Sequence, residues 1–138
     1  FCAGSFSAGE HNDCVAMAKL FADRTHFVHL RSCYIFPNGN FTEASHLGGR
    51  GHLIELCRIF EKAEQEGKCN SGRRLPMRVD HGMTFTDEPG GVFDESNHGH
   101  NAGYTLLGRM FAMGQIQGVI ATVDDELGIK YKQPGFYD

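Results

Sequence analysis

Residues 75 to 82 read LPMRVDHG, a stretch in which a short β-prone run leads directly into an acid, an imidazole and a glycine. A run of this length and composition predicts a strand over residues 75–79. Asp80 and His81 then stand where that strand ends. They belong either to an ordinary turn, in which Gly82 supplies a positive φ, or to a chemical site.

Two earlier stretches predict strands beside this one. The chain opens with Phe1-Cys2, on what we expect to be the last residues of a strand. The stretch THFVHLRS, residues 25–32, mixes β-forming residues with histidine between turn-like flanks and predicts a second strand. Cys2, His29 and Asp80 are therefore expected at or near the ends of three strands.

Helical patterns lie between the predicted strands. Apolar side chains at helical spacing predict a helix from about Asn12, a candidate cap together with Asp13, to Phe21. A stronger amphipathic pattern predicts a second helix over about residues 51–66, ended by Gly67. The strands and helices therefore alternate along the chain.

Two stretches are predicted as long loops because proline and glycine punctuate them, residues 33–51 and residues 82–103. After the second loop, residues 103–127 carry leucine and methionine at helical spacing until Gly114 and Gly118 interrupt it. We expect two short helices in succession there.

The order strand, helix, repeated three times, predicts a parallel α/β architecture. The distance along the chain from Cys2 to His29 matches the roughly 30 residues of one unit in a (β/α)8 barrel. About three such units cannot close a barrel, and an open three-stranded parallel sheet leaves its edges uncovered. Because the chain opens on Phe1 rather than methionine, we expect residues 1–138 to be a single partial domain of a larger protein.

The composition excludes several classes of partner. The 138 residues are 41% hydrophobic and 22% charged, which is typical of a globular protein, and the net charge of -4 includes no basic block. We expect no nucleic-acid partner, and no membrane partner because no apolar run approaches the ~20 residues of a span. Five cysteines without a CxxC pair favour reduced thiols in a cytoplasmic protein.

In parallel α/β folds the active site lies at the carboxyl ends of the strands. There Cys2, His29 and Asp80 offer sulfur, nitrogen and oxygen, a set that can hold a divalent metal and leave positions open for a substrate. Each also has an ordinary interpretation: a buried apolar cysteine, a hydrogen-bonded core histidine and an aspartate in a turn. Both interpretations stay open at this point.

Five motifs in a fixed order resemble one known family. They are FCAGS (1–5), THFVHLRS (25–32), NFTEASHLGG (40–49), MRVDHG (77–82) and AGYTLLGRMFAMGQIQGV (102–119). Together they resemble the C-terminal part of the D-mannonate dehydratases, xylose-isomerase-like TIM-barrel enzymes of sugar-acid catabolism. The resemblance implies a lyase, more specifically a hydro-lyase, that dehydrates D-mannonate to 2-dehydro-3-deoxy-D-gluconate in hexuronate and glucuronate catabolism. It also implies that this chain is the C-terminal portion of a TIM barrel.

The same resemblance implies the site. It places the metal ligands on Cys2, His29 and Asp80, with a divalent metal that is most often Mn2+ and alternatively Fe2+, and with a remaining histidine ligand before Phe1. It places the catalytic proton transfers on His81 and Tyr104, without saying which is acid and which is base.

Two further residues are candidates for binding a sugar-acid substrate. Arg31 is the nearest cation for the substrate carboxylate, and His46 could bind a substrate hydroxyl.

Other hypotheses fit the same residues. The first is a metal-dependent sugar isomerase or epimerase of the same barrel superfamily, because these ligand types do not define a reaction. A second is a non-catalytic fragment that folds only with the remainder of its barrel. A homo-oligomer is a further possible partner state. The third is an α/β binding domain in which the histidines are structural.

Overall fold

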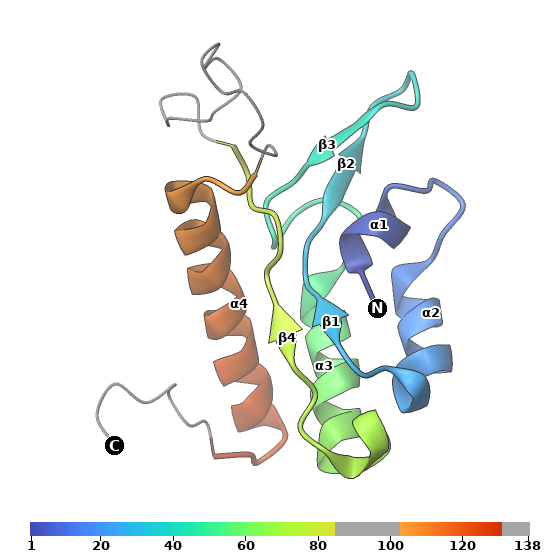
Figure 1. The fold of residues 1–138 in the computed structure, drawn as a ribbon, viewed down its shortest axis with the longest axis vertical. Helices are drawn as coiled ribbons and strands as arrows, with labels where there is room; N and C mark the ends of the chain where they lie inside the picture. Colours follow the sequence, from blue (N-terminus) through green and yellow to red (C-terminus); the bar gives the residue numbers. More distant parts are fainter. Residues whose placement is uncertain (85–102, 131–138) are drawn as a thin grey trace.

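The computed structural model describes residues 1–84 and 103–130. This part of the chain consists of helices and short strands (Figure 1). The helices and strands are α1 (Ala3–Ser7), α2 (Cys14–Phe21), η1 (Ala22–Arg24), β1 (Val28–His29), β2 (Cys33–Ile35), β3 (Phe41–Glu43), α3 (Leu53–Gln65), η2 (Asn70–Gly72), β4 (Met77–Arg78) and α4 (Leu106–Glu126).

The strands β1 and β4 pair in parallel, with Val28 opposite Met77. Cys2 joins the other side of β1 through an isolated parallel bridge to His29. The extended pieces therefore lie side by side in the order in which they occur along the chain, with α2 and α3 as the connections. The parallel α/β arrangement predicted from the alternation is confirmed for the described residues, although each strand is shorter than its sequence pattern.

The helices α2, α3 and α4 form a row, in which α3 lies in the middle and behind the strands (Figure 1). The core lies between this row and the strands, where the side chains of Val28, Leu30, Leu56 and Phe60 are completely buried. Burial of an aliphatic or aromatic side chain of this size contributes about 1.5–3 kcal/mol. The row of helices thereby holds the parallel strands from one side and fixes where their carboxyl ends lie.

Local signals place the first two long helices. Asp13 caps α2, because its Oδ1 accepts from the backbone N–H groups of Val15 at 3.0 Å and Ala16 at 2.9 Å. The helix α3 ends at Gln65, ahead of Gly67, whose φ of +66° suits a helix terminus. Both helices confirm the predictions from spacing. The short helix α1 that follows Cys2 has no counterpart among the predicted elements.

The prediction of an irregular loop over residues 33–51 is wrong in part, because β2 and β3 form an antiparallel hairpin. The turn places Gly39 at a φ of +84°, and its N–H donates to the carbonyl of Phe36 at 2.9 Å. The Asn38-Gly39 pair is the signal that could have indicated a hairpin. This correction matters because the hairpin extends beyond the carboxyl end of β1 (Figure 1).

The prediction of two short helices over residues 103–127 is also wrong, because α4 is continuous over 21 residues. A Cβ at Gly114 or Gly118 would meet nothing within 4 Å, so neither glycine serves a close approach. Each costs the helix about 1 kcal/mol relative to alanine. Buried contacts of Ala112, Ile116 and Val123 with the core offset that cost.

On length and composition alone α4 could cross a membrane, with a mean hydropathy of 1.2 over 18 residues. A single helix of this kind is weak evidence for a membrane span. The helix packs against α3 within the described residues, as a helix of the α/β layer does. Most of the second predicted loop, residues 85–102, lies outside the described residues.

Candidate active site

The carboxyl ends of the parallel elements bring Cys2, His29 and Asp80 together. One ligand atom from each lies within 4.8 Å of the other two. The set of donors, one thiolate sulfur, one imidazole nitrogen and one carboxylate oxygen, fits a divalent transition metal. Three protein ligands leave coordination positions for other groups, so the arrangement suits a catalytic site better than a closed structural one.

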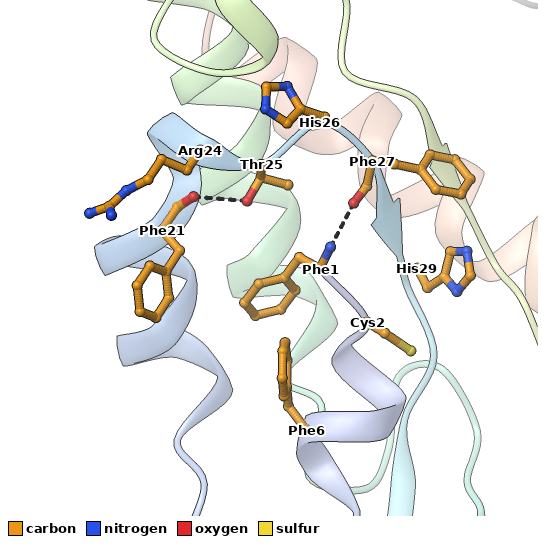
Figure 2. Close-up of a pocket in the computed structure, with 9 residues that line it drawn as sticks. All are labelled: Phe1, Cys2, Phe6, Phe21, Arg24, Thr25, His26, Phe27 and His29. Atoms are coloured by element: carbon orange, nitrogen blue, oxygen red, sulfur yellow. Dashed lines mark hydrogen bonds between the residues drawn. The ribbon is translucent and has the colours of Figure 1, made fainter.

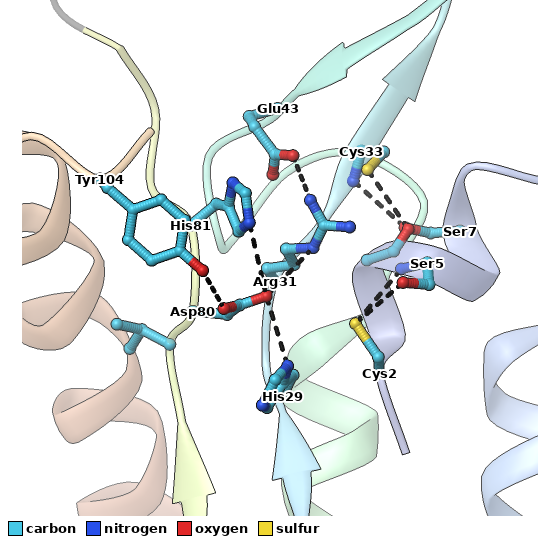
Figure 3. Close-up of polar contacts among 12 residues, drawn as sticks. Cys2, Ser5, Ser7, His29, Arg31, Cys33, Glu43, Asp80, His81 and Tyr104 are labelled. Carbon is cyan, nitrogen blue, oxygen red and sulfur yellow. Dashed lines mark hydrogen bonds and ion pairs between the residues drawn. The ribbon is translucent and has the colours of Figure 1, made fainter. Parts of the chain in front are cut away.

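Asp80 is the centre of this cluster (Figure 3). It is 5% exposed and adopts a left-handed φ of +57°, a conformation that aspartate tolerates better than most residues. Its Oδ2 lies 3.3 Å from His29 Nδ1, and its Oδ1 lies 3.1 Å from an Nη of Arg78. The hydroxyl of Tyr104 donates to Oδ1 at 2.9 Å. The strand end therefore holds a buried carboxylate among donors and cations.

These neighbours set the charge of Asp80. Burial alone would raise its pKa, but the Tyr104 hydrogen bond and the charges of His29, His81 and Arg78 outweigh burial and lower the pKa below its ordinary value. Asp80 is thus ionised at neutral pH, which is the state that a metal ligand requires.

Cys2 is held at the start of α1. Its sulfur accepts from the backbone N–H of Ser5 at 3.5 Å and from the Ser5 hydroxyl at 3.2 Å. These two donors fix the orientation of the sulfur at the edge of the cluster. Ser5 is a contact that reasoning from sequence missed, although it belongs to the FCAGS motif.

His81 and Tyr104 lie next to Asp80 on the other side of the cluster. Their rings are tilted by 50° with centroids 4.2 Å apart, and His81 Nε2 lies 3.8 Å from Asp80 Oδ2. The pKa of Tyr104 is raised, first by desolvation and then by the hydrogen bond to Asp80. The structure therefore brings both predicted proton-transfer residues to the predicted ligand set.

Glycines make this approach of two chain segments possible. The N–H of Gly82 donates to the carbonyl of Gly103 at 2.7 Å. A Cβ at Gly82 would lie 2.3 Å from the carbonyl oxygen of Gly108, and a Cβ at Gly103 would lie 2.5 Å from that of Gly82. Any larger residue would push the start of α4, and with it Tyr104, away from Asp80.

Arg31 also reaches the cluster. Its Nε lies 3.5 Å from Asp80 Oδ2, and its Nη1 makes an ion pair with Glu43 at the end of β3. The pKa of Glu43 is raised because burial outweighs the opposite effect of Arg31. Reasoning from sequence missed Glu43, because residues 33–51 were predicted as a loop without a fixed place in the fold.

His46 lies apart from this open cluster. Its side chain is 1% exposed, and its Nε2 lies 2.9 Å from the carbonyl oxygen of Val79. Burial lowers its pKa, against the effect of hydrogen bonds to the backbone of Val79 and Leu30. The ring therefore ties together the chain segments that follow β1 and β4.

A hollow of about 530 Å3 lies on another side of Cys2 and His29 (Figure 2). Much of its lining is aromatic, including Phe1, Phe21 and Phe27. An apolar wall offers few hydrogen-bond partners to a polyhydroxylated acid. The polar cluster around Asp80 is therefore the better candidate for binding such a molecule.

Comparisons with known proteins place the chain in one family. The model of the D-mannonate dehydratase (UxuA) family matches residues 1–130. Mannonate dehydratase 2 of Agrobacterium fabrum is 38% identical over 128 residues, which are 91% of this chain and 30% of that protein. A mannonate dehydratase of Saccharophagus degradans is 36% identical over 125 residues, 89% of this chain and 30% of that protein.

A solved structure shows the same fold. The crystal structure of mannonate dehydratase from Streptococcus suis serotype 2 superposes with a TM-score of 0.68 at 20% identity. The match covers 99% of this chain and 37% of that one. The chain thus spans about 30% of the length of the curated relatives that it matches. Since the family model covers nearly all of its residues, the chain belongs to the D-mannonate dehydratase family.

Proposed function

We propose that this chain contributes the greater part of the active site of an enzyme that dehydrates D-mannonate to 2-dehydro-3-deoxy-D-gluconate. The observation that carries the proposal is the convergence of Cys2, His29 and Asp80 within 4.8 Å, with His81 and Tyr104 beside them. The relatives named mannonate dehydratase support the choice of substrate.

A divalent metal fits this ligand set, and we propose Mn2+ with Fe2+ as the alternative. Cys2, His29 and Asp80 would hold it. When bound, such an ion acts as a Lewis acid toward negative charge that develops on the substrate carboxylate. A further histidine ligand would come from a part of the protein outside this chain.

The reaction removes the proton from the carbon next to the carboxylate and expels the neighbouring hydroxyl as water. Tyr104 suits the acid, because its raised pKa keeps the phenol protonated for delivery to the departing hydroxyl. His81, on the other side of the same carboxylate, suits the base. The Tyr104 hydrogen bond to Asp80 keeps the phenol oriented until substrate binds.

Arg31 is the proposed partner of the substrate carboxylate, because its guanidinium lies at the edge of the ligand set. For His46 we propose positioning of the strand ends in place of contact with a substrate hydroxyl. This assignment rests on its burial and on its bond to Val79, the residue before Asp80.

We also propose the larger context of the chain. Residues 1–138 would form a single partial domain, the C-terminal portion of a (β/α)8 barrel, completed by the rest of the barrel and open to homo-oligomer formation. The parallel pairing of β1 with β4 and of Cys2 with His29 supports this proposal. A cytoplasmic location agrees with the five free cysteines.

The test is an assay of D-mannonate with Mn2+, read as formation of a 2-keto-3-deoxy acid. It should compare the longest polypeptide that contains this chain with the 138-residue chain itself. We expect turnover by the longer protein. Turnover of a ketose without any reaction of D-mannonate would overturn the proposal in favour of a sugar isomerase.

One alternative has support for the isolated chain. Because the chain spans about 30% of its relatives, it could be an inactive piece that needs the rest of the barrel. Gel filtration with metal analysis distinguishes the two cases. A folded monomer of 15.3 kDa that holds Mn2+ and turns over D-mannonate would exclude this alternative.

A further inference from the structure

Glu43 lies at the end of the hairpin, outside the set of metal-ligating atoms, and yet reaches the site. It pairs with Cys33 in the antiparallel register of β2 and β3, so the hairpin fixes its backbone. Its side chain is 14% exposed and makes an ion pair with Arg31 Nη1, whose side chain is 13% exposed (Figure 3). A charged pair this far from solvent is little screened by salt.

The stem of Arg31 is fixed independently by a glycine. A Cβ at Gly4 of α1 would lie 2.1 Å from both Cγ and Nε of Arg31 and 2.5 Å from Cδ. The Arg31 side chain therefore crosses the helix in space that only a glycine leaves open. Because the aliphatic part of the side chain is confined there, the orientation of the guanidinium depends on the groups that it binds.

Two carboxylates compete for the Arg31 guanidinium. Asp80 Oδ2 lies 3.5 Å from Arg31 Nε, and Glu43 takes Nη1 from the opposite side. Only Asp80 belongs to the ligand set. Without Glu43, the guanidinium would turn toward Asp80 and away from the orientation in which it can meet a substrate carboxylate. A guanidinium carries five N–H donors, so one held by Glu43 keeps donors for a second carboxylate.

We propose that Glu43 is a positioning residue, which holds Arg31 in the orientation that binds the carboxylate of a sugar-acid substrate and limits its pairing with Asp80. The inference rests on the proposed function for the identity of the substrate. It adds a residue and a role that act through Arg31 and do not touch the reacting atoms.

The test is the variant Glu43→Gln in the longest polypeptide that contains this chain, loaded with Mn2+. Since a charge-assisted bond to Arg31 is lost without loss of volume, we expect Kd and KM for D-mannonate to rise about tenfold. We expect kcat to fall by less than about threefold, because the reacting groups stay in place. Glu43→Asp, which keeps the charge, should recover part of the affinity.

A double-mutant cycle tests whether Glu43 acts through Arg31. In an Arg31→Gln background, Glu43→Gln should change the Kd for D-mannonate by less than about twofold. Glu66→Gln is the matched control, because Glu66 makes an exposed ion pair with Lys68 at 2.7 Å and should leave Kd unchanged. Calorimetry gives Kd, and circular dichroism checks that each variant folds.

The outcomes separate this inference from the proposed function. An unchanged Kd in folded Glu43→Gln, or an equal loss in the Arg31→Gln background, would overturn the positioning role alone. Binding of D-mannonate without turnover would contradict the proposed reaction, and the cycle would still decide the role of Glu43. A wild-type protein that neither binds nor converts D-mannonate would overturn both.

Discussion

Two aspartates of this chain are buried to a similar degree, but their pKa values are shifted in opposite directions. Asp80, at the strand ends, is 5% exposed and Asp124, near the end of α4, is 7% exposed. The pKa of Asp80 is lowered despite burial, whereas burial raises the pKa of Asp124. The difference lies in their neighbours, because His29, His81, Arg78 and Tyr104 surround Asp80.

The acidic cluster, which we define as Glu61, Glu64 and Asp124, lies toward the carboxyl ends of α3 and α4. Burial raises the pKa of Glu61 to about 7, with added repulsion from Asp124 and Glu64. Among the described residues, Oδ1 of Asp124 has no hydrogen-bond partner. Burial therefore outweighs the effect of Arg74 at Asp124, whereas the Tyr104 hydrogen bond and the neighbouring charges outweigh burial at Asp80 and lower its pKa.

The first prediction concerns the carboxylates of Asp80 and Asp124. Asp80→Asn removes a proposed metal ligand and the centre of the charge network, so we expect kcat/KM to fall at least about a hundredfold, with loss of the proposed Mn2+. Asp124→Asn is the matched change at equal burial, and it should keep metal and activity. Metal analysis and the D-mannonate assay measure both. Equal activity in the two variants would refute the distinction drawn between the two sites.

The second prediction concerns His46, whose ring joins the segments after β1 and β4. His46→Ala leaves the Val79 carbonyl unpaired in the core, so we expect the free energy of unfolding to fall by about 2 kcal/mol at pH 7. Urea unfolding measures the change. His26→Ala is a suitable control, because His26 makes an exposed hydrogen bond to Asn70 and should cost far less.

His46 also predicts a pH dependence with a definite sign. Its pKa is lowered in the folded state from an ordinary value of 6.5, so the unfolded chain binds more protons just below that pH. Stability should therefore be complete above about pH 6.5 and decline as the pH falls below it. In His46→Ala this part of the decline should disappear. An identical slope in both proteins would show that His46 titrates normally.

The convergence of Cys2, His29 and Asp80 could be predicted because each lies at or near the end of a predicted strand, and parallel strands end at one edge of a sheet. Glu43 could not, since its place depends on a hairpin whose two strands are held by pairing and not by a strong apolar pattern. His46 was recognised as a candidate, but its burial arises from packing between distant segments. Glycine propensity does not predict the continuous α4, because contacts of the helix with the core outweigh that propensity and the sequence does not show those contacts.

A smaller effect tests the acidic cluster. The pKa of Glu61 is about 7 in the folded chain and has an ordinary value of 4.5, so the folded state binds more protons between these values. Stability should therefore fall as the pH rises through this window. Glu61→Gln should raise the free energy of unfolding by about 1 kcal/mol at pH 8 and change it little at pH 4.5. A gain of equal size at both pH values would indicate improved packing and not relief of charge.

The smallest effect separates glycines that the site needs from those that it does not. A Cβ at Gly118 would meet nothing within 4 Å, so Gly118→Ala should stabilise α4 by about 0.5–1 kcal/mol without changing activity. At Gly82 the same substitution would place a Cβ 2.3 Å from the carbonyl oxygen of Gly108, so it should displace Tyr104 and lower kcat. Thermal unfolding and the D-mannonate assay measure the two changes. If both substitutions were neutral for kcat, the close approach at Gly82 would not be what positions Tyr104 beside Asp80.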